Sequence, residues 1–108
     1  MPWVVKAANA VSRLAGLAMP FSAGDFDLDD GHIGSAYGVP SAASLAAVAL
    51  GGRSEGLVLD PVYTGKALHG LAQWIRSDGA MVGKRVLFVH TGGLPGLLAQ
   101  GEEFERCL

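Results

Sequence analysis

Two short apolar runs, each followed by a cluster of polar residues and glycines, constrain the fold of this chain most. The run at 57–59 leads into DPVYTGK, and the run at 86–89 leads into HTGGLP. Residues 62–77 between them carry apolar side chains at helical spacing, so the sequence predicts strand, helix, strand. A crossover of this kind makes the strands parallel and the connection right-handed. Both polar clusters are therefore expected at one sheet edge, where open α/β folds bind ligands.

The composition indicates a part of a larger structure. The chain has 108 residues, of which 17% are charged and 50% hydrophobic, and its mean hydropathy is +0.35. An average soluble domain has about 25% charged residues. Strands buried on both faces also need helices above and below and neighbouring strands on each side, which one βαβ unit cannot supply.

The fold class that we expect is therefore α/β, as a partial three-layer open sheet that is mostly parallel. Residues 1–100 would form part of an α/β domain, and residues 101–108 a polar tail. The chain would be a piece of a larger domain or one half of an assembly that completes the sheet. A self-sufficient three-layer mini-domain is the alternative.

Charge and metal-ligand spacing exclude several classes of function. The net charge of −2 and the scattered basic residues do not suit nucleic acid, which needs a clustered basic surface. Cys107 is the only cysteine, and His32, His69 and His90 share no metal-ligand spacing. The four aspartates within 25–30 lack the spacing of a calcium loop. No metal site is expected.

The sequence predicts no membrane partner. No apolar run approaches the roughly 18 residues that span a bilayer. Residues 1–24 could pass for a signal peptide, but Lys6 and Arg13 interrupt the stretch where an apolar core should be. An amphipathic helix fits this stretch better, so a cytoplasmic location is the expectation.

The remaining elements follow from local signals. We expect a helix over 2–15 and a short strand within 25–29. Ser41 is a plausible N-cap for a second helix, which the glycine pair 51–52 would end or weaken. A last helix would run over 95–100.

By themselves, the polar clusters support a modest claim. The backbone N–H groups of Thr91, Gly92 and Gly93 could bind an anion or a polar ring atom at a helix N-terminus, or the glycines could simply form a tight turn. Tyr63 could project over the sheet edge or be an ordinary buried tyrosine. Lys66, one turn further along, reads as a solvated side chain.

The strings LDPVYTGKALHGL and VLFVHTGGLPGLL resemble the C-terminal part of a family of pyridoxal-phosphate enzymes. This family comprises D-cysteine desulfhydrase and 1-aminocyclopropane-1-carboxylate deaminase. The resemblance is specific over 55–95 and extends more loosely back to the first helix. It covers most of this chain but only about the last third of such an enzyme. It implies the fold of the tryptophan synthase β type, in which pyridoxal 5'-phosphate lies between two α/β domains.

The resemblance also implies roles for particular residues. Tyr63 matches the tyrosine of the DPVY motif, which serves as nucleophile or acid/base, and Tyr37 matches a second active-site tyrosine. Thr91, or its alternative Thr64, would place a hydroxyl against the pyridine nitrogen of the cofactor. Gly92, in the turn after Thr91, is a further expected cofactor contact.

The two threonines favour one activity of this family. Deaminase-like sequences tend to have glutamate where Thr64 stands and leucine where Thr91 stands, whereas desulfhydrase-like ones have hydroxyls. A neutral hydroxyl favours an unprotonated ring nitrogen, which suits the rapid loss of a β-leaving group. The expected reaction is therefore α,β-elimination of D-cysteine to pyruvate, ammonia and sulfide. The alternatives are 1-aminocyclopropane-1-carboxylate deaminase and a non-catalytic α/β binding or interaction module.

Parts that such an enzyme needs are expected upstream of this chain. The resemblance places the Schiff-base lysine and the phosphate-binding loop there, and no lysine of this chain stands in the matching context. The chain alone is therefore expected to be inactive, and its parent to be an enzyme. The implied partners are a small amino-acid substrate, the missing N-terminal portion or a complementary chain, and a second copy in a homodimer. Gly51, Gly52 and Gln100 depart from the residues that the family prefers.

Overall fold

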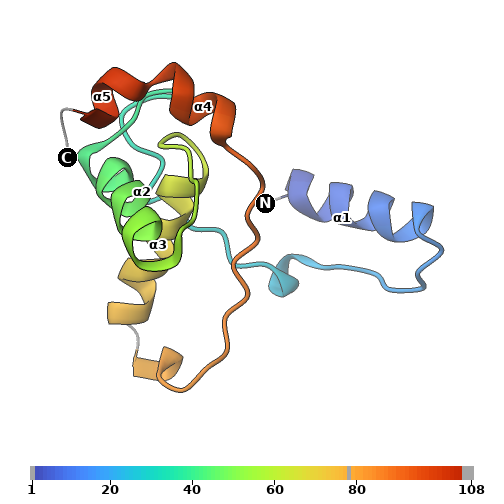
Figure 1. Ribbon diagram of the computed structural model, residues 1–108. Coiled ribbons are helices and arrows are strands. Elements are labelled where there is room, and N and C mark those ends of the chain that lie inside the picture. Colours follow the sequence, from blue (N-terminus) through green and yellow to red (C-terminus); the bar gives the residue numbers. More distant parts are fainter. Residues whose placement is uncertain (1, 78, 106–108) are drawn as a thin grey trace.

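The structure is an open arrangement of helices joined by long extended segments (Figure 1). It is a computed structural model, and it describes residues 2–77 and 79–105. The α-helices are α1 (Pro2–Leu14), α2 (Ala42–Glu55), α3 (Thr64–Ser77), α4 (Leu94–Ala99) and α5 (Gly101–Glu105). Two short 3-10 helices are η1 (Ala23–Asp25) and η2 (Gly79–Met81).

The predicted sheet is wrong. The described residues contain no strand, so neither a mostly parallel sheet nor a βαβ unit is present. The runs at 57–59 and 86–89 are extended, but they share no backbone hydrogen bonds. A strand needs a neighbour whose N–H and C=O groups complete its ladder, and the described part of the chain supplies none. The two runs are joined instead by a side chain, because Nε2 of His90 lies 3.0 Å from the carbonyl oxygen of Val58.

The predicted short strand within 25–29 is also wrong. The chain forms the 3-10 helix η1 at Ala23–Asp25, and the residues that follow are irregular. The carboxylate of Asp25 accepts hydrogen bonds from the backbone N–H and the hydroxyl of Ser22, at 2.7 and 2.8 Å. Local capping of this kind competes with strand formation for the same backbone groups.

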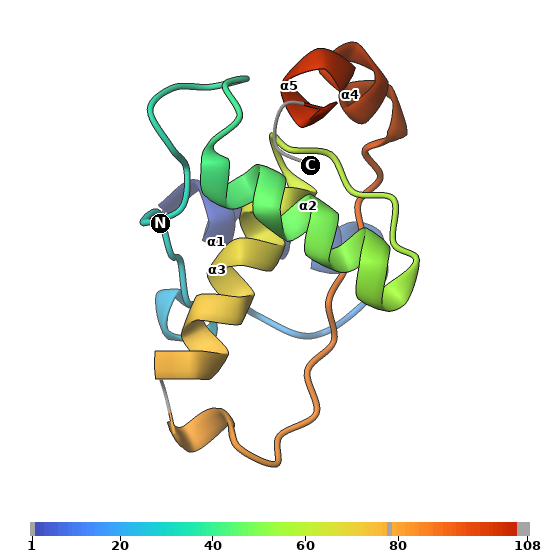
Figure 2. The same ribbon diagram turned by 60° about the vertical axis from the view of Figure 1, so that its left-hand side comes forward.

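The core lies between α2 and α3, which cross each other (Figure 2). Close approach requires Gly65, because a Cβ atom there would lie 2.8 Å from Cγ2 of Val48 and 2.9 Å from the carbonyl oxygen of Ser44. The buried apolar side chains are Leu45, Ala47, Val48 and Leu59. Three of these four belong to α2, so the core is small and local.

Helix α2 begins at the predicted N-cap, and the glycine pair 51–52 lies inside it. The Ser41 hydroxyl accepts the N–H of Ser44 at 3.0 Å, which confirms the N-cap. The glycine pair 51–52 does not end the helix, which continues to Glu55. Gly51 is buried, and a Cβ atom on it would lie 2.9 Å from Cδ1 of Leu59. The glycine is therefore a packing requirement.

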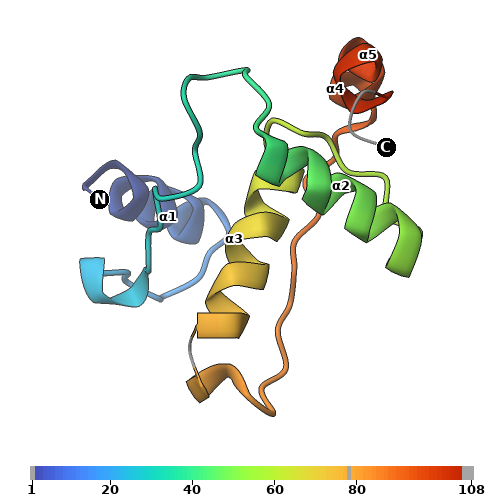
Figure 3. The same ribbon diagram turned by 90° about the vertical axis from the view of Figure 1, so that its left-hand side faces the viewer.

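The first and last predicted helices are confirmed as α1 and α4. Helix α1 stands away from the pair formed by α2 and α3 (Figure 3). Residues Gly101–Glu105 of the expected polar tail form α5. Cys107, expected to be unpaired, lies outside the described residues. Among the helices that the structure describes, none is long and apolar enough to cross a bilayer.

The chain buries little of its apolar surface. Its radius of gyration is 16.0 Å, whereas a compact domain of this length has about 13 Å. Its accessible surface is 7742 Å², against about 5,700 Å² for a compact monomer of this mass. Leu14 and Leu87 are 89% and 87% exposed. These features agree with the prediction that the chain is part of a larger domain.

Candidate active site

The turn that leads into α3 is organised by the side chain of Asp60. Its carboxylate accepts the N–H groups of Val62 at 2.8 Å, Tyr63 at 2.8 Å and Thr64 at 2.9 Å. The Thr64 hydroxyl donates to the same carboxylate at 2.7 Å and accepts the N–H of Asp60 at 2.8 Å. Asp60 is 2% exposed. Every lone pair of the carboxylate is therefore directed at the turn, and Tyr63 is held at a fixed place.

These hydrogen bonds decide the charge of Asp60. Burial alone would raise the pKa of this carboxyl, because a charge is less stable away from water. The hydrogen bonds from Thr64, Tyr63 and Val62 outweigh burial and hold the pKa of Asp60 below its ordinary value of 3.8. Asp60 is therefore an anion at neutral pH.

The second polar cluster packs directly on the first. A Cβ atom on Gly93 would lie 2.8 Å from the backbone nitrogen of Asp60, and one on Gly96 would lie 3.3 Å from Cβ of Asp60. The backbone N–H of Gly92 donates to Nδ1 of His90 at 3.0 Å. Because Nδ1 accepts this hydrogen bond, the ring proton is on Nε2, which faces the carbonyl oxygen of Val58. The two clusters meet as the sequence predicts, although no sheet joins them.

The two predicted tyrosines are brought together. The hydroxyl groups of Tyr37 and Tyr63 are hydrogen-bonded to each other, and their rings meet edge to face with centroids 6.1 Å apart at 65°. The hydrogen bond to Tyr37 is the main cause that raises the pKa of Tyr63, followed by burial and by the charges of Tyr37 and Asp60. A tyrosine is neutral at physiological pH in any case, and the raised pKa of Tyr63 keeps the proton on its phenol.

Both tyrosines face a hollow of about 380 Å³, within the usual size range of ligand sites of about 300–1,000 Å³. Its lining consists of Tyr37, Gly38, Asp60, Val62, Tyr63, Thr91, Gly92, Gly93 and Gly96. Within the residues that the structure describes, the Thr91 hydroxyl has no hydrogen-bond partner, so it is available to a ligand. The hollow thus contains four of the five predicted site residues.

Thr64 is the fifth predicted site residue, and its hydroxyl is engaged elsewhere. It is 2% exposed, and its hydroxyl has three contacts with Asp60: it accepts the backbone N–H at 2.8 Å, donates to the carboxylate at 2.7 Å and has a longer contact of 3.4 Å with the backbone carbonyl. Thr64 contributes to the wall of a larger cleft that adjoins the hollow. Of the two threonines, Thr91 is therefore the one with a free hydroxyl.

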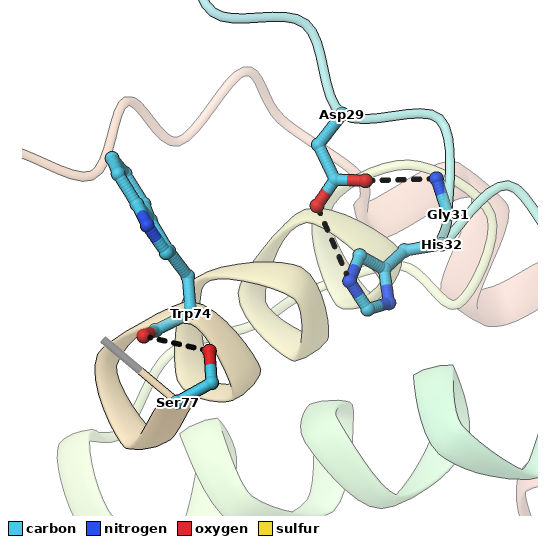
Figure 4. A network of polar contacts seen from close by, with 5 residues as sticks. All are labelled: Asp29, Gly31, His32, Trp74 and Ser77. Carbon is cyan, nitrogen blue, oxygen red and sulfur yellow. Dashed lines mark hydrogen bonds and ion pairs between the residues drawn. The ribbon is translucent and has the colours of Figure 1, made fainter.

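Asp29 and His32 line part of the larger cleft, and Figure 4 shows the polar contacts that Asp29 makes with Gly31 and His32. The Asp29 carboxylate accepts the N–H of Gly31 at 2.8 Å and lies 3.3 Å from Nε2 of His32. The ring of His32 meets that of His69 edge to face, with centroids 5.1 Å apart. Across the part of the chain that the structure describes, no three histidine, cysteine or acidic side chains gather into a metal site.

Sequence reasoning missed four residues that hold this site in place. Asp60 followed by proline is a helix-start signal, so its capping role could have been found. Lys66, Gln100 and His90 carry no such signal, because their bonds join segments that are distant in sequence. Lys66, expected to be solvated, is 8% exposed, and its ammonium donates to the carbonyl of Ile33 at 2.6 Å.

The hollow combines two paired phenols, a free hydroxyl and a glycine turn. This combination suits a flat aromatic cofactor with a small substrate. The model of the family described as "Pyridoxal-phosphate dependent enzyme" matches residues 3–92, so the chain belongs to this family. The expectation of pyridoxal phosphate is confirmed at the level of the family.

The curated relatives carry a more specific name. The chain is 37% identical over 103 residues to a 1-aminocyclopropane-1-carboxylate deaminase of Burkholderia ambifaria, covering 95% of this chain and 30% of that protein. It is 34% identical to a probable 1-aminocyclopropane-1-carboxylate deaminase of Schizosaccharomyces pombe, with the same coverage. The chain thus spans about 30% of the length of these relatives. The comparison with solved structures gives no match.

The residues of the hollow fit the cofactor. Thr91 offers an uncharged hydroxyl, which suits a ring nitrogen, and Tyr37 and Tyr63 offer aromatic faces and hydroxyls. The Asp60 carboxylate is saturated by its own turn, so it does not compete for the ligand. Gly92 and Gly93 adopt φ angles of 105° and 146° and bring backbone rather than side chain to the wall.

Proposed function

We propose that this chain forms the substrate-facing part of a pyridoxal-phosphate enzyme of the 1-aminocyclopropane-1-carboxylate deaminase type. Such an enzyme opens the ring of a small amino acid and releases ammonia. The observation that carries the proposal is the hydrogen-bonded pair of Tyr37 and Tyr63 at the hollow. The names of the relatives support the same reaction.

Tyr63 is the residue that we propose to move a proton. Its phenol is neutral at physiological pH, and the Asp60 turn fixes the start of α3 beside it. A neutral phenol within reach of the substrate can give its proton to a carbon that becomes negatively charged. Tyr37 holds the Tyr63 hydroxyl in orientation and can replace the proton that it gives away.

Thr91 and the glycine turn are the proposed contacts to the cofactor. Bound pyridoxal phosphate supplies an electron sink for the substrate carbon. The Thr91 hydroxyl would hold the ring nitrogen, and the backbone of the glycine turn would lie against the ring edge. The ring of Tyr63 would exclude water from one side.

The proposed enzyme also needs residues outside this chain. Lys66 donates to a backbone carbonyl, and Lys6 and Lys84 are exposed, so none of the three is placed as a Schiff-base lysine. We propose that this lysine comes from an upstream portion, which would also cover the exposed apolar surface of α1 and of 86–89. A dimer and a cytoplasmic location remain part of this proposal.

A second candidate is the α,β-elimination of D-cysteine to pyruvate, ammonia and sulfide. The free hydroxyl of Thr91 favours it, because a neutral partner leaves the ring nitrogen unprotonated. Thr64 gives no further support, since its hydroxyl is occupied by Asp60. The relatives named as deaminases make this the weaker candidate.

A chimera would test these activities. The part of the Burkholderia ambifaria deaminase that aligns with this chain is replaced by residues 2–105, and the purified protein is checked for bound cofactor by its absorbance. Ammonia release is measured with 1-aminocyclopropane-1-carboxylate, and sulfide release with D-cysteine. The unmodified relative serves as the control for folding and loading.

Ammonia from the cyclopropane substrate without sulfide would support the main proposal. Sulfide from D-cysteine would favour the second candidate. A chimera that binds the cofactor but turns over neither compound would contradict both, and would leave a non-catalytic binding module.

A further inference from the structure

The segment that carries Tyr37 has little structure of its own. Residues 33–38, here called the Tyr37 segment, contain no helix, and Tyr37 is 85% exposed. The hydrogen bond nearest to it within its own loop joins the N–H of Val39 to the carbonyl of Ala36 at 3.4 Å, which is long. Something outside the segment must therefore hold Tyr37 against Tyr63.

Two side chains reach the backbone of this segment from elsewhere in the described structure. Nζ of Lys66 donates to the carbonyl of Ile33 at 2.6 Å. Nε2 of Gln100 donates to the carbonyl of Gly38 at 3.2 Å. The two bonds lie on opposite sides of Tyr37, one at each end of the segment.

Lys66 is built into the protein rather than solvated. It lies on α3 one turn after Tyr63 and is 8% exposed. Gly34 makes room for it, since a Cβ atom there would lie 3.2 Å from Nζ of Lys66, and the φ angle of +77° also favours glycine. A buried ammonium usually pairs with a carboxylate. Among the described residues, Lys66 pairs only with the Ile33 carbonyl.

Burying the side-chain amide of Gln100 costs free energy, and the hydrogen bond from this amide to Gly38 would explain why an amide is present. Gln100 is the C-cap residue of α4 and is partly buried. Its Oε1 atom is buried without a hydrogen-bond partner in the described part of the protein. Buried polar atoms are normally paired, so an apolar side chain would be easier to accommodate here. What the amide provides is the donor to Gly38.

We propose that Lys66 and Gln100 are positioning residues for Tyr37. By holding the two ends of the Tyr37 segment, they keep its hydroxyl bonded to that of Tyr63. Lys66 couples the segment to α3, which carries Tyr63 at its start, and Gln100 couples it to α4 beside the glycine turn. A catalytic role for these two hydrogen bonds rests on the proposed function, but their role in holding Tyr37 against Tyr63 does not.

The chain offers a test that needs neither cofactor nor activity. Tyr37 and Tyr63 are its only tyrosines. Their titration can be followed separately by NMR of the chain with isotope-labelled tyrosine, each signal being assigned with a phenylalanine variant. The variants are Lys66→Met, which shortens the side chain by one atom and removes the donor, and Gln100→Met. Lys66→Arg retains a donor, and Lys84→Met changes an exposed lysine as the matched control.

We expect the titration midpoint of Tyr63 to lie above its ordinary value of 10.0 in the parent chain and in Lys84→Met, because Tyr63 is hydrogen-bonded to Tyr37. This elevation should shrink in Lys66→Met and in Gln100→Met, and should be largely restored in Lys66→Arg. A smaller elevation of the Tyr63 midpoint should persist, because the charge of Asp60 is still present. Far-ultraviolet circular dichroism confirms that each variant retains its helices.

An unchanged elevation of the Tyr63 midpoint in both methionine variants, with the helices retained, would overturn the proposal. If Lys66→Met unfolds, Gln100→Met alone decides, since it also removes the unpaired Oε1 and is not expected to destabilise the chain. Failure of the chimera to turn over substrate would leave this result untouched, so the two proposals fail separately.

Discussion

Gly93 lies so close to Asp60 that a methyl group on its α-carbon would come within 2.8 Å of the Asp60 backbone nitrogen. This contact joins the two polar clusters of the sequence and places the glycine turn beside Tyr63. The φ angle of Gly93 is +146°, which other residues rarely adopt.

The first prediction separates close packing from backbone strain. Gly92→Ala introduces a strained φ of 105° with nothing within 4 Å, and should cost about 1–3 kcal/mol. Gly93→Ala adds the collision with Asp60 and should cost about 1–3 kcal/mol more. Urea unfolding of both variants measures the difference. Equal losses would show that Gly93 does not pack on Asp60 as described.

The second prediction concerns the charge of Asp60. Its pKa is lowered in the folded chain, so its ionised form stabilises the fold above pH 3.8, and this contribution is lost as the pH falls through the lower folded value. Asp60→Asn should lose about 1–3 kcal/mol near neutral pH, because the turn loses its charged acceptor. The loss should vanish in acid.

Urea midpoints measured across the acid range check this dependence on pH. Asp30→Asn, at an exposed aspartate, is the matched control and should follow the parent chain. A loss in Asp60→Asn that is the same at every pH would mean that shape, and not charge, matters at this position.

The third prediction concerns the tyrosine pair. Tyr37→Phe removes the main cause of the raised pKa of Tyr63, so this pKa should fall toward its ordinary value of 10.0. The variant contains a single tyrosine, so its tyrosinate absorbance reports Tyr63 alone. No fall, in a variant whose helices are intact, would show that the hydroxyls are not in contact in solution.

The fourth prediction concerns the glycine pair of α2. Gly52 is exposed, so Gly52→Ala should stabilise the helix by about 1 kcal/mol. Gly51→Ala gains the same helix propensity but collides with Leu59, which should cost about 1–3 kcal/mol. Thermal unfolding of the two variants should therefore rank Gly52→Ala above Gly51→Ala. Equal stabilisation by the two substitutions would support the sequence-based view that both glycines merely weaken the helix.

The helices could be predicted from sequence because their signals are local. The N-cap Ser41, the apolar spacing in 62–77 and Gly16, which follows α1 with a φ angle of 67°, act within a few residues. Such local signals could not show whether the chain forms a sheet, because a strand requires a hydrogen-bonded neighbouring strand. The runs at 57–59 and 86–89 have the composition of buried strands, but the described part of the chain gives them no ladder.

The candidate site was predictable in part for the same reason. Tyr37, Tyr63 and Thr91 stand in motifs, and the structure brings them to one hollow. The engagement of Thr64 with Asp60 depends on a turn whose capping was not anticipated. The burial of Lys66 depends on a segment 33 residues away, and no local pattern reports it.

The central claim is that Tyr63 moves a proton at a pyridoxal-phosphate site, and turnover of the chimeric enzyme carrying Tyr63→Phe tests it most directly. Turnover should fall about 100- to 10,000-fold, because a proton donor is lost. Cofactor affinity, measured by absorbance, should change little, since the ring of residue 63 is retained. Equal losses of turnover and of cofactor affinity would contradict the account and make the phenol a structural group.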